Sequence, residues 1–158
     1  TAYFAQYGVP AKVVRLTQTF GPGVAYDDGR VFAEFARCAI EKRNIVLHTK
    51  GETKRSYLYT EDAAAAILTV LLKGESGQAY NAANEETYCS IREMAQLVAE
   101  ECAKGEIGVD IQIEDESKFG YAPVLRMNLD TRKLRNLGWR AKVDLKTAFL
   151  YMMRDMKR

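Results

Sequence analysis

The sequence predicts an α/β fold, in which short strands alternate with amphipathic helices. Residues 12–17 (KVVRLT) form a β-branched run whose length is typical of a buried, parallel strand, and residues 78–83 (QAYNAA) form a second short strand. Between them, apolar residues recur at helical spacing over 31–43 and 62–73. We therefore expect both strands to belong to a larger parallel sheet, and a smaller α+β lobe to be formed mainly by residues 85–158.

The chain is predicted to open in a helix that ends at Gly8, because glycine suits the left-handed position after a helix. Since residue 1 already lies inside this helix, we expect a truncated chain. The strand over 12–17 should stop near Gln18. A turn-rich loop, residues 19–30, follows with Gly21-Pro22-Gly23 as its tightest turn.

Arg30 is predicted to lie in the first turn of the helix that continues to Arg43. A cation at this position opposes the helix dipole, at a cost of roughly a few tenths of a kcal/mol. Two explanations fit this placement. Arg30 helps to hold an anion, or it is an arginine that simply faces solvent.

Residues 45–48 and 50–59 are predicted to pair as a hairpin across the turn at 49–53. The second strand runs straight into a helix start at Thr60-Glu61-Asp62. This places the cation of Arg55 at a strand-to-helix corner, where the free N–H groups and the dipole of the helix also favour anions. A phosphate-bearing ligand is one hypothesis, and an edge strand with ordinary surface charges is the other.

The C-terminal half contains the clearest helix signal. Ser90 and Glu93 are spaced as a capping box, and the apolar face that follows them ends at Cys102. Residues 109–113 alternate like a half-buried strand, and residues 121–126 are expected to be extended because Pro123 disfavours a helix at Ala122.

The last two helices are predicted from their caps. Asp130 is expected to cap a short helix over 134–137, with Trp139 behind it as a packing anchor. Asp144 opens the final helix. The apolar residues of that helix form one stripe, which we assign to the core: Leu145, Ala148, Phe149, Met152 and Met156.

The composition is that of an ordinary globular protein of one domain, since 158 residues suffice for a sizeable core. The net charge of +2 is too small to indicate nucleic-acid or membrane binding, so an anion site must be local. The longest apolar run, residues 63–72, is far too short to span a bilayer.

Cys38 and Cys102 fall on apolar helix faces and are predicted to be reduced thiols of a cytoplasmic protein. His48 is the only histidine, so no metal site is expected.

Three arginines stand on loops or at the ends of elements: Arg30, Arg55 and Arg126. The forked, permanently charged guanidinium suits phosphate oxygens, so several arginines that converge on one point would clamp a diphosphate. Each of them taken alone is equally typical of a protein surface.

Six segments of the chain resemble, in the same order, the C-terminal half of the extended short-chain dehydrogenase/reductases that act on nucleotide sugars. The resemblance covers nearly all 158 residues and is strongest toward UDP-glucuronate decarboxylases and dTDP-glucose 4,6-dehydratase-like enzymes, with 4-epimerases close behind. The segments are RLTQTFGPG (15–23), DGRVFAEF (28–35), GETKRSYLYTEDAA (51–64), GQAYNAAN (77–84), SIREMA (90–95) and LDTRKLRNLGW (129–139).

This resemblance implies the C-terminal portion of a Rossmann-type fold and a nucleotide-diphosphate sugar as substrate. It places Arg30 and Arg55 on the nucleoside diphosphate and Arg126 near a further substrate-side arginine. Gln18 stands where many members have an asparagine that contacts the sugar nucleotide, and the longer amide leaves the identity of the sugar open. Tyr57 and Tyr59 then shape the pocket, or they simply pack within the hairpin. The cofactor of the parent enzyme would be NAD or NADP.

The catalytic parts of that family are missing from the sequence. There is no glycine-rich turn of the dinucleotide-binding kind, and none of the nine tyrosines has a lysine four residues later. The nearest pair is Tyr88 with Arg92. Residues 1–158 are therefore expected to be one substrate-binding portion of a longer enzyme, with no catalytic residue of its own and no cofactor bound alone.

Two hypotheses for function remain. In the first, the parent enzyme oxidises a nucleotide sugar transiently at C4 before epimerisation, dehydration or decarboxylation, and this chain holds the substrate. In the second, the chain is a non-catalytic nucleotide-sugar-binding or scaffold domain. In either case a cut sheet would expose a strand edge, so we expect a homo-oligomer.

Overall fold

The computed structural model describes residues 2–113 and 124–157. The predicted extended stretch 121–126 therefore lies partly outside the described residues. The elements, in chain order, are α1 (Ala2–Tyr7), β1 (Val13–Leu16), β2 (Gln18–Phe20), α2 (Val31–Glu41), β3 (Ile45–Leu47), β4 (Lys54–Tyr59), α3 (Thr60–Lys73), β5 (Ala79–Ala82), β6 (Asn84–Ser90), α4 (Ile91–Leu97), the π-helical turn η1 (Val98–Cys102), β7 (Val109–Ile111), β8 (Arg126–Met127), α6 (Arg132–Arg135) and α7 (Leu145–Met156).

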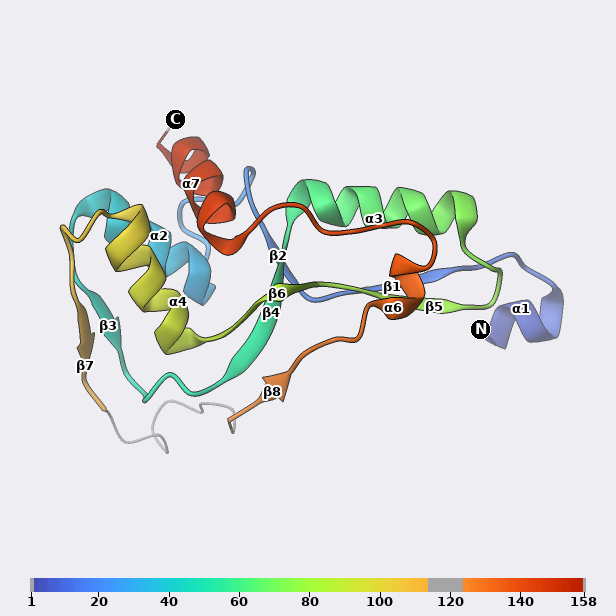
Figure 1. The fold of residues 1–158 in the computed structure, drawn as a ribbon, viewed down its shortest axis with the longest axis horizontal. Coiled ribbons are helices and arrows are strands. Elements are labelled where there is room, and N and C mark those ends of the chain that lie inside the picture. Colours follow the sequence, from blue (N-terminus) through green and yellow to red (C-terminus); the bar gives the residue numbers. More distant parts are fainter. Residues whose placement is uncertain (1, 114–123, 158) are drawn as a thin grey trace.

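The predicted α/β fold is confirmed, and its two predicted strands form a parallel two-stranded sheet among the described residues. β1 is mostly exposed and not buried as predicted, and membership of a larger sheet stays a prediction. β1 and β5 lie parallel, with Val13 opposite Ala79 and Leu16 opposite Ala82. Figure 1 shows this pair at one end of the molecule, near α1, α3 and α6, while α2, α4 and α7 lie at the other end. The strand over 12–17 does not simply stop near Gln18, because Gln18 begins β2 in a different sheet.

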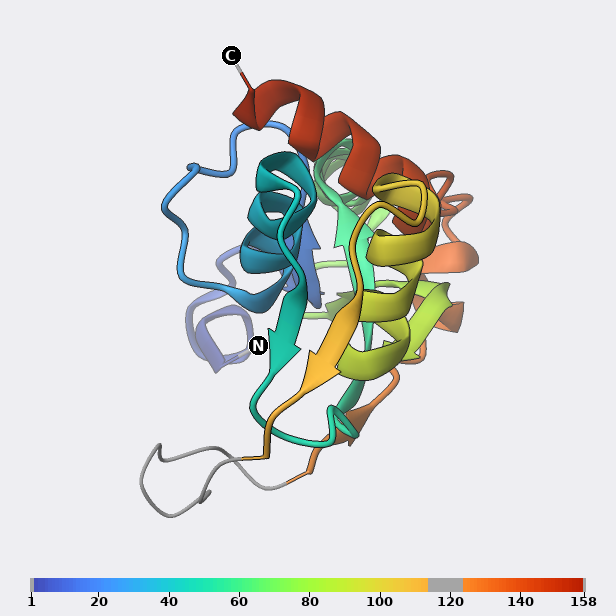
Figure 2. The same cartoon turned by 90° about the vertical axis from the view of Figure 1, so that its left-hand side faces the viewer.

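The predicted hairpin is wrong. β3 pairs in parallel with β7, which Figure 2 shows as two arrows running side by side in the same direction. β4 instead lies between other strands, parallel to β2 and β8 and antiparallel to β6. The physical reason is burial on both faces of β4, since Ser56, Tyr57, Leu58 and Tyr59 are all buried. A strand buried in this way lies in the interior of a sheet and cannot be the edge of a hairpin.

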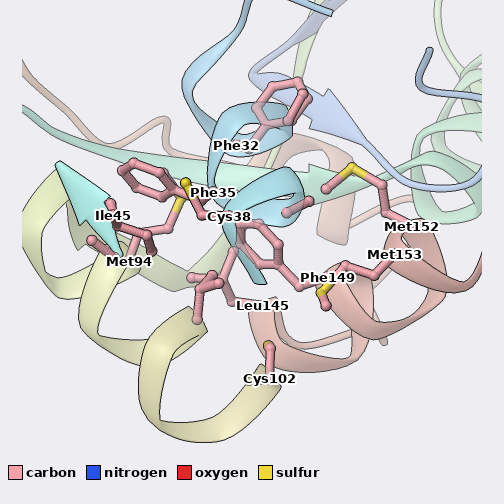
Figure 3. Packing of buried hydrophobic residues seen from close by; sticks show 14 of the residues in the cluster. Phe32, Phe35, Cys38, Ile45, Met94, Cys102, Leu145, Phe149, Met152 and Met153 are labelled. Carbon is pink, nitrogen blue, oxygen red and sulfur yellow. The ribbon is translucent and has the colours of Figure 1, made fainter. Parts of the chain in front are cut away.

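Two hydrophobic clusters hold the fold together. The larger one joins α2, α4, η1 and α7, and Figure 3 shows its side chains pointing toward one another around Phe149. Within it the predicted stripe of α7 is confirmed, with Met156 half-buried at the edge. Phe20, Phe32 and Ile45 also belong to this cluster, so residues before 85 contribute to its core. The division of the chain at residue 85 stays a prediction.

The predicted helix starts are mostly confirmed. At the capping box, Ser90 N donates to Glu93 Oε2 at 2.6 Å and Glu93 N donates to Ser90 Oγ at 3.0 Å. Asp144 accepts a hydrogen bond from Thr147 N at the start of α7. The short helix near Asp130 begins at Arg132, two residues earlier than predicted. The N–H of Arg132 donates to Asp130 Oδ1 at 2.9 Å.

The cysteines are free thiols, and Cys38 and Cys102 are buried as predicted. Burial is the main reason why the pKa of each of these two thiols rises to about 11. Among residues 2–113 and 124–157, no cluster of His, Cys, Asp and Glu is arranged to hold a metal ion. No helix in those same ranges is long and apolar enough to cross a membrane.

Candidate functional site

Strand β4 brings together three segments that are far apart in the sequence. Its first residue, Lys54, lies opposite Ser90 of β6 on one edge and opposite Arg126 of β8 on the other. This register places two cations, Lys54 and Arg126, beside Ser90 at the same end of one sheet. Positive charge is therefore concentrated locally on a chain whose net charge is small.

A pocket of about 260 Å³ opens at this end of β4, and we call it the basic pocket. Its lining residues are Lys50, Gly51, Glu52, Lys54, Ser90, Arg92 and Arg126. Four of them are cations and one is a carboxylate. Lys54 is partly neutralised by Glu93, whose Oε2 lies 3.2 Å from Lys54 Nζ. The remaining charges leave the pocket positive, which suits an anionic ligand.

The wall of the basic pocket depends on Gly51. Its backbone has φ +67°, which L-residues with side chains rarely adopt, and an added Cβ would lie 2.9 Å from Arg92 N. Arg92 N donates to Gly51 O at 3.1 Å. The loop thus passes close to the first turn of α4, and this close approach positions Arg92 at the pocket.

Arg55 is the next residue of β4, opposite Cys89 of β6 and Met127 of β8. Its Nε is buried and has no hydrogen-bond partner, and the same holds for Ser56 Oγ and Tyr57 Oη. Folded proteins pair the great majority of their buried polar atoms. These three side chains lie on alternating faces of β4, and Ser56 and Tyr57 are fully buried, so each is an unsatisfied polar group of the interior that an ordered water could pair.

A second pocket, of about 530 Å³, lies beside the basic pocket, and we call it the large pocket. The two pockets are neighbours because they share one stretch of chain: residues 47–49 line the large pocket, and residues 50–52 and 54 line the basic pocket. At the start of α4, Ile91 likewise lines the large pocket and Arg92 the basic pocket. Other walls come from α2, which contributes Phe35, and from Gln112, the residue directly after β7. Buried Phe35 and Leu47 supply an apolar floor, whereas His48, Thr49 and Gln112 supply polar groups. Sequence reasoning missed this pocket because it depends on the unpredicted pairing of β3 with β7.

Arg30 lies at the rim of the large pocket, between the lining residues Gly29 and Val31. It is the N-cap of α2, one position before the first turn in which it was predicted. Its guanidinium pairs with Asp28 at 2.5 Å and lies 4.7 Å from the ring centre of Phe32. Hydrogen bonds from Arg30 lower the pKa of Asp28 to about 2. Arg30 is therefore already engaged by a carboxylate.

The four predicted site residues do not form one cluster. Arg126 lines the basic pocket and Arg30 flanks the large pocket. Gln18, half-buried at the start of β2, lies opposite Tyr57 on the strand next to Arg55. Gln18 and Arg55 line neither pocket. They lie on the neighbouring strands β2 and β4, and among the described residues β2 pairs only with β4.

Comparison with known proteins identifies the class. Residues 1–83 match the model of the NAD dependent epimerase/dehydratase family, and the chain belongs to this family. Among curated relatives, the dTDP-D-glucose 4,6-dehydratase of Bos taurus is 28% identical over 148 residues, which is 92% of this chain and 40% of that protein. The UDP-glucuronic acid decarboxylase 2 of Arabidopsis thaliana is 26% identical over 155 residues, 98% of this chain and 33% of that one. The chain thus spans less than half the length of these relatives.

Solved structures show the same fold. The UDP-glucose 4-epimerase of Thermotoga maritima, solved with UDP-glucose, superposes with a TM-score of 0.83 at 21% identity, over 99% of this chain and 48% of that one. The dTDP-glucose 4,6-dehydratase of Bacillus anthracis, solved with NAD, gives 0.79 at 20% identity, over 99% and 47%. The predicted family and the predicted Rossmann-type relationship are therefore confirmed.

Proposed function

We propose that this chain is the substrate-binding portion of an NAD(P)-dependent enzyme that acts on a nucleotide-diphosphate sugar. The nucleoside lies in the large pocket, and the diphosphate lies against the basic pocket and Arg55. The sugar extends toward Gln18 on β2. Family membership supports the substrate class, and the solved relatives bind UDP-glucose in one case and NAD in another.

The observation that carries this proposal is the pairing of two unlike pockets. A nucleoside diphosphate has a flat, largely apolar base with polar edges at one end and two negative phosphates at the other. The large pocket has the apolar floor and polar rim that small-molecule sites use, and the adjacent basic pocket has the charge for phosphates. Arg55 follows Lys54 on β4 and adds a permanent positive charge next to the basic pocket.

Arg30 and Gln18 take supporting roles in this proposal. Arg30 reaches the ligand by exchanging Asp28 for a phosphate or ribose oxygen, since both partners accept from the same guanidinium. Gln18 offers an amide that donates and accepts, which is what hydroxyl groups of a sugar require.

The chain itself does not fit the dinucleotide. A Rossmann cofactor needs a glycine-rich strand-to-helix turn for its pyrophosphate, and Gly21-Pro22-Gly23 continues into Val24 rather than into that motif. No lysine follows any tyrosine at the fourth position, so the acid/base pair is also absent from the sequence. We therefore assign to these residues the binding and orientation of substrate, and no chemical step.

The test is calorimetric titration of the full-length protein with UDP and dTDP. Arg55→Ala should weaken binding at least about tenfold, because loss of a hydrogen bond to a charged group costs about 1.5–3 kcal/mol. Arg132→Ala is the matched control, since Arg132 is exposed, is paired with Asp130 and lines neither pocket. Absence of binding by the unaltered protein, or equal affinity for Arg55→Ala, would contradict the proposal.

A second candidate function is a non-catalytic nucleotide-sugar-binding or scaffold domain. It would hold if the full-length protein also lacked the glycine-rich turn and the Tyr–Lys pair. It predicts the same UDP affinity but no cofactor binding and no turnover by the full-length protein. Determining the coding sequence upstream of Thr1 separates the two, because both motifs must be found there if the enzyme hypothesis holds.

We also propose that the protein is cytoplasmic and that residues 1–158, when isolated, self-associate. The free cysteines fit a reducing compartment. Among the described residues, β1 and β5 pair only with each other, so each has an open edge. Beside them, α3 exposes Ile67, Leu68, Leu71 and Leu72. An open edge next to an apolar helix face favours association with another chain.

A further inference from the structure

A third pocket lies at the opposite end of β4 from the basic pocket. It has a volume of about 390 Å³, and we call it the α7 cleft. Its lining residues are Pro22, Tyr59, Glu61, Tyr151, Arg154 and Asp155. None of them lines the basic pocket or the large pocket. Lys54 and Tyr59 are the two ends of β4, so at about 3.3 Å per residue their Cα atoms lie about 16 Å apart. The α7 cleft is therefore separate from the proposed nucleotide site.

Two tyrosine rings form the wall of the α7 cleft. Their centroids are 5.9 Å apart with the planes tilted by 51°. Tyr59 is 4% exposed, whereas Tyr151, on the outer part of α7, is 42% exposed. Figure 1 shows α7 near the ends of β2 and β4, where α3 begins. The cleft thus has a fixed inner ring and an accessible outer ring.

The loop at the mouth of the cleft is also fixed. Gly23 N donates to Asp155 Oδ2 at 2.7 Å, which ties the Gly-Pro-Gly turn to α7. At Gly21 an added Cβ would lie 2.6 Å from Thr60 Oγ1 and 2.9 Å from the ring of Tyr59. The turn therefore packs directly on the tyrosine wall, and the shape of the cleft is already formed without a ligand.

The polar groups of the cleft are largely unused. Within the part of the chain that the structure describes, the side chains of Glu61 and Arg154 make no hydrogen bond and no ion pair. The guanidinium of Arg154 lies 5.9 Å from the ring centre of Tyr151 and is otherwise available. Only one oxygen of Asp155 is engaged. The cleft thus offers both donors and acceptors beside two aromatic faces.

The mixture of charges limits what the cleft can bind. Two carboxylates disfavour an anion, and the guanidinium disfavours a cation. A neutral ligand with many hydroxyl groups meets neither penalty, because hydroxyls donate to the carboxylates and accept from the guanidinium, while C–H faces pack on the rings. We propose that the α7 cleft binds a neutral, polyhydroxylated ligand of the carbohydrate class, independently of the nucleotide site.

The proposal is tested on the full-length protein by recording backbone amide NMR spectra with methyl glucoside, spermidine and inorganic phosphate as separate probes. Methyl glucoside at millimolar concentration should shift the amides of Gly23 and Arg154, and Tyr151→Ala should weaken this binding at least tenfold. Tyr26→Ala is the matched control, since Tyr26 is likewise 42% exposed but lines none of the three pockets. If Tyr151→Ala does not fold, Arg154→Ala takes its place with the same expected loss.

Three outcomes would overturn the proposal. The first is that no probe shifts these amides. The second is that spermidine or phosphate shifts them and methyl glucoside does not. The third is that both cleft variants bind methyl glucoside as well as the unaltered protein does. Because UDP binding is not measured here, failure of this proposal leaves the proposed nucleotide site untouched.

Discussion

Trp139 donates a hydrogen bond from its indole Nε1 to the backbone carbonyl oxygen of Asp62, at 3.1 Å. Both residues are buried, although they stand 77 positions apart. The carboxylate of the same Asp62 accepts from the N–H groups of Lys142 and Val143, each at 3.0 Å. One residue in the first turn of α3 therefore fixes the segment that leads from α6 into α7.

Replacing Asp62 by alanine should destabilise the protein by about 2 kcal/mol, because two backbone N–H groups lose their acceptor in a buried place. At this chain length the melting temperature should fall by roughly 4–8 °C. Glu61→Ala is the control, since Glu61 is exposed in the same helical turn and has no hydrogen bond in the described part of the chain. Equal melting temperatures for the two variants would show that the tether is not needed.

Gly51→Ala should both destabilise the protein and weaken UDP binding. A left-handed residue with a Cβ costs about 1–2 kcal/mol, and the backbone of Arg92 leaves no room for the extra carbon. Gly105→Ala is the matched control, because Gly105 has φ +75° and nothing lies within 4 Å of the added Cβ. Urea unfolding and UDP titration of both variants check this. A Gly105→Ala variant that loses as much stability as Gly51→Ala would contradict it.

Stability should fall as the pH rises above about 8.5, where unfolded thiols begin to ionise. Burial raises the pKa of Cys38, Cys89 and Cys102 to about 11, so the folded state keeps its thiol protons over this range while the unfolded state loses them. The stability is fully present at pH 7 and is lost progressively as the pH approaches 11. Urea unfolding at a series of pH values measures the slope.

The control for this pH dependence is a variant with alanine at all three cysteines, because lysines and tyrosines also titrate at high pH. Its stability should change less between pH 7 and pH 10 than that of the unaltered protein. Identical slopes would mean that the thiols do not contribute.

Self-association of the isolated residues 1–158 should depend on the exposed face of α3. Replacing Leu68 and Leu72 by lysine places two charges on side chains that are 56% and 78% exposed, so dimers or larger species should dissociate without loss of fold. Light scattering across a concentration series measures the change. Ile113→Lys, which alters a 60% exposed residue outside α3, should leave association unchanged. A monomer at every concentration in the unaltered protein would rule out the association.

The local signals in the sequence predicted the elements that depend on neighbouring residues. The capping box at Ser90, the cap at Asp144 and the apolar stripe of α7 all appear as predicted. The predicted strand-to-helix corner at Arg55 is not formed, because Arg55 lies near the start of β4 whereas α3 follows the other end of that strand. The role of Arg55 in binding stays a prediction. Arg126 lines the basic pocket that its charge suggested.

The predictions that failed depend on which strands lie side by side. Residues 45–48 and 50–59 look like a hairpin because they are close in sequence, yet β3 pairs with residues more than sixty positions later. The large pocket arises from that pairing, so no local pattern could reveal it. The roles of Lys50 and Arg92 likewise follow from the close approach of Gly51 to α4.

The sequence by itself determined the main helices, the strands β1, β3, β4, β5 and β7, and the family, because these follow from periodicity, capping residues and ordered motifs along the chain. It did not reveal β2, β6 or η1. Only the tertiary structure decided that Lys54, Arg92 and Arg126 share a pocket and that Arg55 has a buried, unpartnered Nε. The physical reason is that the charge of a pocket and the burial of its side chains depend on residues from segments that are far apart in the sequence. Strand pairing selects those segments, and pairing is set by which faces the whole core buries.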